Sequence, residues 1–268
     1  MFNLLRMDLY RAKRSKSLYV CFGILLIATV VIFGMVWLMG TPRGQETAIR
    51  IGMISADELQ DASSILDGVD SLLMFRQTCL DGGMYNLIFG IWVMLFVCMD
   101  FQSGFIKNVM ALYQNRWNYI GSKLLTAGLV DFCFLALHLL FTLLMNKLFG
   151  NMVPDAKWED IVFYLSWTWL LTTAFAALLL MICVLTRSVA AGALAAVLLG
   201  GGAVVMPLYS ILNMFHAGEW LKHTIYLTLS MGPGHCASIQ DLYVYATGAG
   251  FLILYTIIAG IVLKRQDI

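Results

Sequence analysis

Two ionisable side chains within an apolar stretch have the clearest potential for chemistry. Asp131 and His138 both lie in residues 124–145, where most neighbours are apolar. In a helix their seven-residue spacing puts them on one face, where Thr142 extends the polar stripe. An ionisable group at membrane depth is costly and usually faces the bundle interior or a water-filled path. The pattern supports a proton relay, a buried structural network, or an Asp131 that lies near the cytoplasmic edge.

Other catalytic patterns are missing from the sequence. It contains no G-x-x-x-x-G-K-[S/T] motif, so no P-loop cradles nucleotide phosphates, and it contains no H-E-x-x-H or C-x-x-C motif. His216, His223 and His235 share one segment, but their spacing is irregular and no paired carboxylate or cysteine accompanies them. We therefore predict no metal, no cofactor and no catalytic residue on this chain. A membrane enzyme would lack a recognisable nucleophile.

The composition excludes an ordinary soluble domain. Hydrophobic residues make up 60% of the 268 residues and charged residues 12%, whereas soluble domains are roughly 45–50% apolar and about 25% charged. A bilayer would solvate the excess apolar surface. The net charge of +1 gives no global field that would recruit nucleic acid.

Six stretches have the length and apolar character of membrane-spanning helices, which need about 20 residues. They are Leu18–Met39, Gly82–Met99, Leu124–Met145, Ile161–Leu185, Val189–Phe215 and Tyr243–Leu263. Three residues separate the fourth and fifth stretches, so these two must form a tight hairpin. The sequence therefore predicts an all-α integral membrane protein with six transmembrane helices.

The distribution of charge predicts the orientation. Basic residues cluster before the first stretch, between the second and third, and after the sixth, while acidic residues concentrate in residues 40–81. Lysine and arginine mark the cytoplasmic side of membrane proteins. We therefore expect both termini in the cytoplasm and residues 40–81 outside, in a multi-pass protein of the plasma membrane.

The first 16 residues have the pattern of an interfacial amphipathic helix. Phe2, Leu5, Leu9 and Ala12 recur at helical spacing, and basic residues occupy much of the remaining surface. Such a helix can lie in the headgroup plane and lead into the first span. The alternative is a solvated basic segment that only sets the topology.

The outer side combines a long loop with a broken segment before the last span. Apolar residues at 51–54 and 65–75 predict short helices packed on the outer surface of the 40–81 loop. Residues 217–229 are amphipathic, and the glycines and proline of 231–235 end them, which predicts a re-entrant or interfacial helix. Cys79 and Cys236 share this side, where they would form a disulfide or remain free thiols.

The 100–123 connection predicts a short cytoplasmic helix between the second and third spans. Gly104 ends the second span, and Phe105, Val109 and Leu112 lie on one side of the following segment. A helix parallel to the membrane would present Lys107, Asn108, Gln114, Asn115 and Arg116 to the cytoplasm. An ordinary positive loop is the alternative.

Small residues recur at four-residue steps in the fifth span, at Gly192, Ala196 and Gly200. This spacing lets helix backbones approach closely in lipid, so we expect helix packing there, with a flexible point facing a substrate as the alternative. Pro207 is expected to kink or weaken this helix near its outer end.

The layout resembles that of the membrane subunits of type 2 ABC transporters. The most specific stretch, D100-F101…G104-F105-I106-K107-N108…R116…Y119…K123-L124, is similar to the family's D-F-x-x-G-x-x-K-N…R…Y…K-L pattern. The sequence is similar in particular to small bacterial permeases associated with export of, or immunity to, antimicrobial peptides.

The resemblance implies a single permease domain over residues 1–268 in a bacterial plasma membrane. A separate ATPase subunit, in two copies, would bind ATP and Mg, and a second permease, identical or related, would complete the translocation path. The residues implied in coupling to the ATPase are Phe105, Lys107, Asn108, Tyr113, Arg116 and Tyr119. The expected substrate is a peptide or another hydrophobic or amphipathic compound.

Two other functions fit the same layout. A proton-coupled secondary transporter would use Asp131 and His138 as a relay, although no similarity between the first and last three spans supports an internal repeat. A non-transporting membrane scaffold or immunity protein would keep the topology without flux.

Overall fold

The computed structural model describes residues 1–52, 66, 68–81, 83–112, 115–215 and 218–265. These residues are mostly helical and contain no β-strand, which confirms the predicted all-α class. The helices before the α6–α7 turn are α1 (Phe2–Arg14), α2 (Lys16–Gly40), α3 (Pro42–Arg50), α5 (Ser71–Phe75), η2 (Arg76–Leu80) and α6 (Met84–Gln102). The others are α7 (Phe105–Leu112), α8 (Trp117–Leu148), α9 (Trp158–Thr186), α10 (Val189–Ala195), η3 (Ala196–Gly200), α11 (Val205–Met214), η4 (Gly218–His223), α12 (Ile225–Met231), η5 (Ile239–Leu242) and α13 (Tyr243–Arg265).

Within the described residues, five helical segments are long and apolar enough to cross a membrane. They are α2, α6, α8, α9 and the segment formed by η5 and α13. The helix over Val189–Gly200 and α11 pass the same test together, but they are bent by 43° relative to each other. A membrane protein is therefore confirmed, with a sixth span if the bent pair crosses as one unit.

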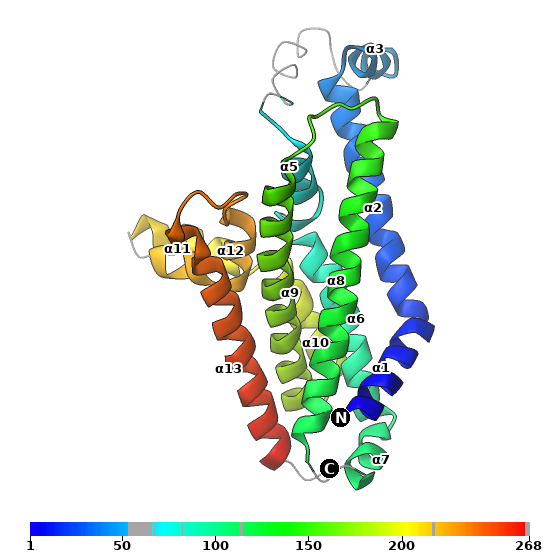
Figure 1. Cartoon of the computed structure of the whole chain (residues 1–268), viewed down its shortest axis with the longest axis vertical. Coiled ribbons are helices and arrows are strands. Elements are labelled where there is room, and N and C mark those ends of the chain that lie inside the picture. Colours follow the sequence, from blue (N-terminus) through cyan, green and yellow to red (C-terminus); the bar gives the residue numbers. More distant parts are fainter. Residues whose placement is uncertain (53–65, 67, 82, 113–114, 216–217, 266–268) are drawn as a thin grey trace.

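α6 and α9 form the centre of the bundle, and α2 and α13 lie at its periphery. In the most apolar windows of α6 and α9, 67% of residues are buried, against 22% in α2 and in the η5–α13 segment. Figure 1 shows α9 between α8 and α13, with α6 behind. The apolar side chains left exposed on α2, such as Ile24 and Ile27, suit contact with lipid.

One end of the bundle gathers several segments that are distant in sequence. The start of α1, the short helix α7 and the last turn of α13 all lie at the lower end in Figure 1, whereas α3 lies at the upper end. α8 reaches this lower end because it begins at Trp117 and not at Leu124 as predicted. Its first turns are polar, and ion pairs described below satisfy them.

The buried face of α1 differs from the predicted one. Leu4, Asp8 and Ala12 are its buried residues, whereas Phe2 is 82% exposed. The prediction aligned only apolar residues and left Asp8 on the solvated side. The helix is rotated because Asp8 has cationic and hydroxyl partners inside the bundle, so its carboxylate belongs to the packed face.

The last part of the 40–81 loop lies inside the bundle and not on its outer surface as predicted. Leu72 and Phe75 of α5 are buried, and the Phe75 ring lies 5.0 Å from the His138 ring of α8. The Ser71 backbone N–H donates to the Pro154 carbonyl at 2.9 Å. These contacts hold α5 against α8 and the segment before α9. The predicted helix at 51–54 lies largely outside the described residues.

The fifth span breaks at Gly201–Val204, before Pro207. Gly202 has a φ of +72°, and a Cβ there would collide with the Tyr226 ring. Both facts require glycine at this turn. Pro207 lies in the first turn of α11, where its missing N–H leaves no helical hydrogen bond unmade. The predicted kink therefore results from the turn at Gly201 and Gly202 and not from Pro207.

Candidate functional site

The helix α7 is the candidate site, because it presents a solvated face at the end of the bundle. Gly104 has a φ of +69°, a left-handed conformation that reverses the chain after α6. Ile106 and Val109 are buried against the bundle, while Lys107 and Asn108 are exposed. The short helix expected between the second and third spans is thus present. Its buried side carries Ile106 and Val109, whereas Leu112, expected on the same side as Val109, is exposed.

The solvated face of α7 consists of Lys107, Asn108, Ala111 and Leu112, which are all exposed. Because residues four apart lie on the same side of a helix, these four form one strip. The strip combines one positive charge and one amide with the side chain of Leu112, which is 80% exposed. An exposed leucine next to a cation on a short helix is suited to contact with another protein.

Directly behind α7, a buried ion network joins α1, α6 and α8. The Lys123 ammonium lies 2.8 Å from Asp8 Oδ1 and 2.7 Å from Asp100 Oδ2. The Arg11 guanidinium donates to Asp100 Oδ1 at 2.6 Å. The formal charges of the two acids and two bases cancel, so the network as a whole is neutral. We call Asp8, Arg11, Asp100 and Lys123 the joint.

Hydroxyl groups and aromatic rings complete the surroundings of the joint. The Ser122 hydroxyl donates to Asp8 Oδ2 at 2.5 Å, and the Tyr119 hydroxyl donates to Asp100 Oδ2 at 3.2 Å. Lys123 Nζ lies 4.0 Å from the centre of the Phe96 ring. Lys123 is 1% exposed and both carboxylates are 0% exposed. Such a set of charges tolerates burial only while every member keeps its partners.

Arg11 connects the joint to the start of α7. Its guanidinium lies 4.5 Å from the centre of the Phe105 ring, as a cation–π contact would place it. Burial disfavours its charged form, but the hydrogen bond to Asp100 and the charges of Asp100 and Asp8 outweigh that effect and raise the pKa of Arg11. The guanidinium therefore stays charged and can hold α7 and α1 together.

A second contact ties the beginning of α8 to the end of α13. Arg116 donates to the carbonyls of Leu263 and Lys264 at 2.6 and 3.2 Å. The last carbonyls of a helix carry partial negative charge, so a guanidinium there is favourable. Gly260 of α13 faces Trp117 so closely that a Cβ would collide with the indole. The lower ends of α8 and α13 are thus connected.

The six residues implied in coupling have different positions. Lys107 and Asn108 lie on the exposed strip. Phe105 contacts Arg11 of the joint and so connects α7 to the bundle. Tyr119 of α8 donates to Asp100, and Arg116 turns back to α13, so neither lies on the strip. Tyr113 lies outside the described residues.

Sequence reasoning did not single out Asp8 and Arg11, or give Asp100 and Lys123 a role beyond the family pattern. One signal was available. Asp8 lies four residues from both Leu4 and Ala12, so it continues their face, and it is the only acid in a basic segment. A lone carboxylate on the packed face of an amphipathic helix indicates a buried cationic partner.

The intramembrane acid Asp131 lies in a pocket of hydroxyl groups. Tyr85 and Thr172 donate to its two carboxylate oxygens at 2.7 and 2.5 Å, and Thr173 donates at 3.1 Å. These donors come from α6 and α9, and Asp131 is 0% exposed. The carboxylate therefore connects the three central helices.

His138 makes a separate contact farther along α8. Its Nε2 atom lies 2.8 Å from the Thr29 hydroxyl of α2. The Thr142 hydroxyl donates to the His138 backbone carbonyl, not to its ring. Seven residues of helix separate Asp131 from His138 by about 10 Å along the axis. Their hydrogen bonds go to different helices, so the stripe is two local contacts rather than a connected chain.

The small-residue stripe faces the neighbouring helices. A Cβ on Gly192 would collide with Met94 of α6, and one on Gly200 would lie 3.0 Å from the Phe175 ring of α9. Ala196 is 0% exposed between them. The stripe thus lies where the helix over 189–200 packs against α6 and α9.

The remaining predictions concern the cysteine pair and the metal-ligating residue types. Cys236 is exposed and free, and the side chain of Cys79 lies outside the described residues. In the described part of the chain, no three His, Cys, Asp or Glu side chains are grouped as a metal site would require.

Comparison of this chain with protein-family models, curated proteins and solved structures finds no match. The functional proposal below therefore rests on the sequence pattern and on the geometry of α7 and the joint.

Proposed function

We propose that this chain is the transmembrane subunit of an ATP-binding cassette transporter, and that α7 docks on a separate ATPase subunit. The observation that carries the proposal is the combination of an exposed strip on α7 with a buried ion network directly behind it. Three of its four charges are fully buried, and a helix that only connected two spans would not need such a network behind it. A helix that transmits force from a bound partner to the bundle would need such a network.

The joint defines how a movement of α7 would reach the membrane. Phe105 of α7 contacts Arg11, and Arg11 contacts Asp100 at the end of α6. Lys123 then links Asp100 to α1 and to its own helix α8. A push on α7 would therefore move the ends of α1, α6 and α8 together. Closure of the ATPase on nucleotide would bias the bundle between two arrangements.

The division of labour follows from the sequence. The chain has no P-loop, so ATP and Mg would bind to the partner, in two copies matched to two permease subunits. The positive side would be cytoplasmic, so the strip and both termini would face the ATPase. We propose export of a peptide or another amphipathic compound.

Asp131 supports a second candidate, a proton-coupled secondary transporter. A fully buried carboxylate inside a membrane bundle is by default a functional hypothesis. Its three hydroxyl donors favour a structural role, as does the fact that Asp131 and His138 bond to different helices. A non-transporting scaffold is the remaining alternative.

The first test is isolation of the tagged chain from its native membranes in mild detergent, with every co-purifying protein identified. We expect a stoichiometric ATPase that carries a P-loop, and a second permease if the complex is a heterodimer. Recovery of the chain alone in several detergents would contradict the proposal.

A further inference from the structure

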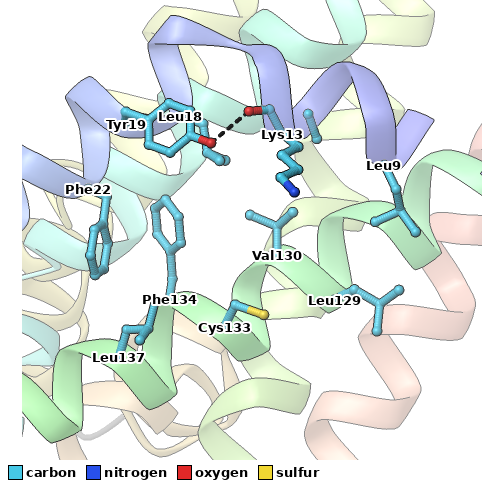
Figure 2. A pocket seen from close by; sticks show the side chains of 11 residues that line it. Leu9, Lys13, Leu18, Tyr19, Phe22, Leu129, Val130, Cys133, Phe134 and Leu137 are labelled. Atoms are coloured by element: carbon cyan, nitrogen blue, oxygen red, sulfur yellow. Dashed lines mark hydrogen bonds between the residues drawn. The ribbon is translucent and has the colours of Figure 1, made fainter. Parts of the chain in front are cut away.

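A groove lies between the elbow that joins α1 to α2 and the middle of α8. Its volume is about 370 Å³, and Figure 2 shows the elbow on one side and the α8 residues Leu129 to Leu137 on the other. Leu129 and Leu137 are 46% and 50% exposed, so the groove opens away from the bundle. The groove opens on the outer surface of the bundle between α2 and α8. In a membrane this surface faces lipid.

The walls of the groove suit a hydrocarbon chain. Leu18 and Phe22 of α2 oppose Val130 and Phe134 of α8, and the Phe22 and Phe134 rings lie 4.9 Å apart. From Leu129 to Leu137 the helix axis rises about 12 Å, which is the length of an extended acyl segment of several methylenes.

The elbow end of the groove is positively charged. Figure 2 shows the Lys13 side chain pointing from the elbow toward α8, and no acidic side chain lines the groove. Among the residues that the structure describes, none forms an ion pair with Lys13. Arg14 and Lys16 are exposed next to it. Tyr19 fixes the elbow by donating its hydroxyl to the Lys13 carbonyl at 2.7 Å.

We propose that this groove binds one anionic phospholipid from the leaflet at the α7 end. One acyl chain lies along α8, and the phosphate lies near Lys13, with Arg14 and Lys16 adding positive potential. Tyr19, an exposed aromatic at this level, marks the headgroup region. The site requires no ATPase partner, so it stands or fails independently of the proposed function.

The bound lipid would also support the joint. Leu9 and Ala12 of α1 line the groove, while Asp8 on the neighbouring part of the same helix binds Lys123 inside. A lipid in the groove therefore covers the outer side of α1 and keeps water from the ion network.

Cys133 makes the site measurable, because it lines the groove and is exposed. A Cys79→Ser/Cys236→Ser background leaves it as the accessible thiol, since Cys21, Cys98 and Cys183 are buried. The full chain, labelled at Cys133 with bimane, is placed in nanodiscs that contain brominated phosphatidylglycerol or brominated phosphatidylcholine. We expect phosphatidylglycerol to quench at a lower mole fraction than phosphatidylcholine.

The charge at the elbow should set this preference. Lys13→Gln is expected to lower it about fivefold, since a basic residue near an anionic leaflet contributes about 1 kcal/mol and 1.4 kcal/mol is a factor of ten. Lys147→Gln, an exposed lysine at the other end of α8, should leave the preference unchanged. Val130→Phe, which enlarges the side chain that lines the groove without quenching bimane itself, should weaken quenching by both lipids at unchanged helical content.

Three outcomes would overturn the proposal. One is equal quenching by the two lipids, and another is a Lys13→Gln variant that matches Lys147→Gln. The third is a groove occupied by a second copy of this chain, detected as Cys133–Cys133 cross-linking that Val130→Phe abolishes together with the dimer mass.

Discussion

At the scale of single residues, the buried carboxylates Asp8, Asp100 and Asp131 have two kinds of surroundings. Asp131 accepts from neutral hydroxyls, so its surroundings hold a carboxylate in place without a counter-charge. Asp8 and Asp100 instead have cations within 3 Å. The first arrangement holds neighbouring helices together through hydrogen bonds. The second is an ion network in which each charge depends on its partners.

The prediction at this scale concerns Asp131→Asn. The asparagine keeps the shape and one acceptor oxygen but presents an amide to hydroxyl groups that donate now. We expect a loss of about 1–3 kcal/mol in the free energy of unfolding, the usual cost of unsatisfied buried groups, and ATP-driven transport that persists. Unfolding in mixed micelles, and uptake of a labelled cationic peptide by inverted proteoliposomes with the ATPase, would measure both.

The same vesicles test the rival function. Uptake driven by an imposed pH gradient without ATP, present in the wild type and lost in Asp131→Asn, would contradict our account. It would establish the carboxylate as part of a proton path.

The residues of interest could be found from the sequence more readily than their partners. An acid and a histidine stand out within an apolar run, so Asp131 and His138 were identifiable. Tyr85, Thr172 and Thr29 were not, because they lie on other helices and resemble any other hydroxyl residue in a span. Which helices meet is decided by tertiary packing, to which a single sequence gives no direct access.

At the scale of elements, hydropathy located the spanning helices well but not their ends. α8 extends to Trp117 because the joint and Arg116 satisfy its polar first turns. α5 lies inside the bundle because Phe75 packs on His138 and Tyr164. The helix α7 could be anticipated because Gly104 and its apolar spacing are local signals. The buried side of α1 was signalled only by the position of Asp8, since its partner Lys123 lies far along the chain.

The prediction at this scale concerns the joint, which holds three helices together. Lys123→Met removes the central cation and leaves Arg11 as the one cation of the joint beside Asp8 and Asp100. We expect a loss of about 3–5 kcal/mol in the free energy of unfolding, the cost of breaking a buried ion pair from one side. Unfolding of the purified chain in mixed micelles measures it.

Lys147→Met is the matched control, because it is the same substitution on the exposed part of the same helix. It should change stability by no more than about 0.5 kcal/mol. In Asp8→Asn/Lys123→Met the loss should be smaller than the sum of the two single losses, since coupled residues are not additive. Additive losses, or a Lys123→Met variant as stable as Lys147→Met, would contradict the joint as described.

At the scale of the whole molecule, the connections run from the α7 end into the bundle. The joint links α7 to α1, α6 and α8, Arg116 links α8 to α13, and Asp131 links α8 to α6 and α9 farther up. The strip on α7 is solvated while its supports are buried. A protein that binds there would contact a helix that is tied through Arg11 to the ends of α1, α6 and α8.

The most direct test of this account is a comparison of ATPase recovery on three tagged forms of the chain. They are the wild type, Lys107→Glu/Leu112→Glu on the strip, and Lys147→Glu at the opposite end. The joint is untouched in all three, so each should fold and extract equally. We predict that the strip variant loses the ATPase at least tenfold, while the wild type and Lys147→Glu retain it. Equal recovery of the ATPase on the strip variant would contradict docking at α7.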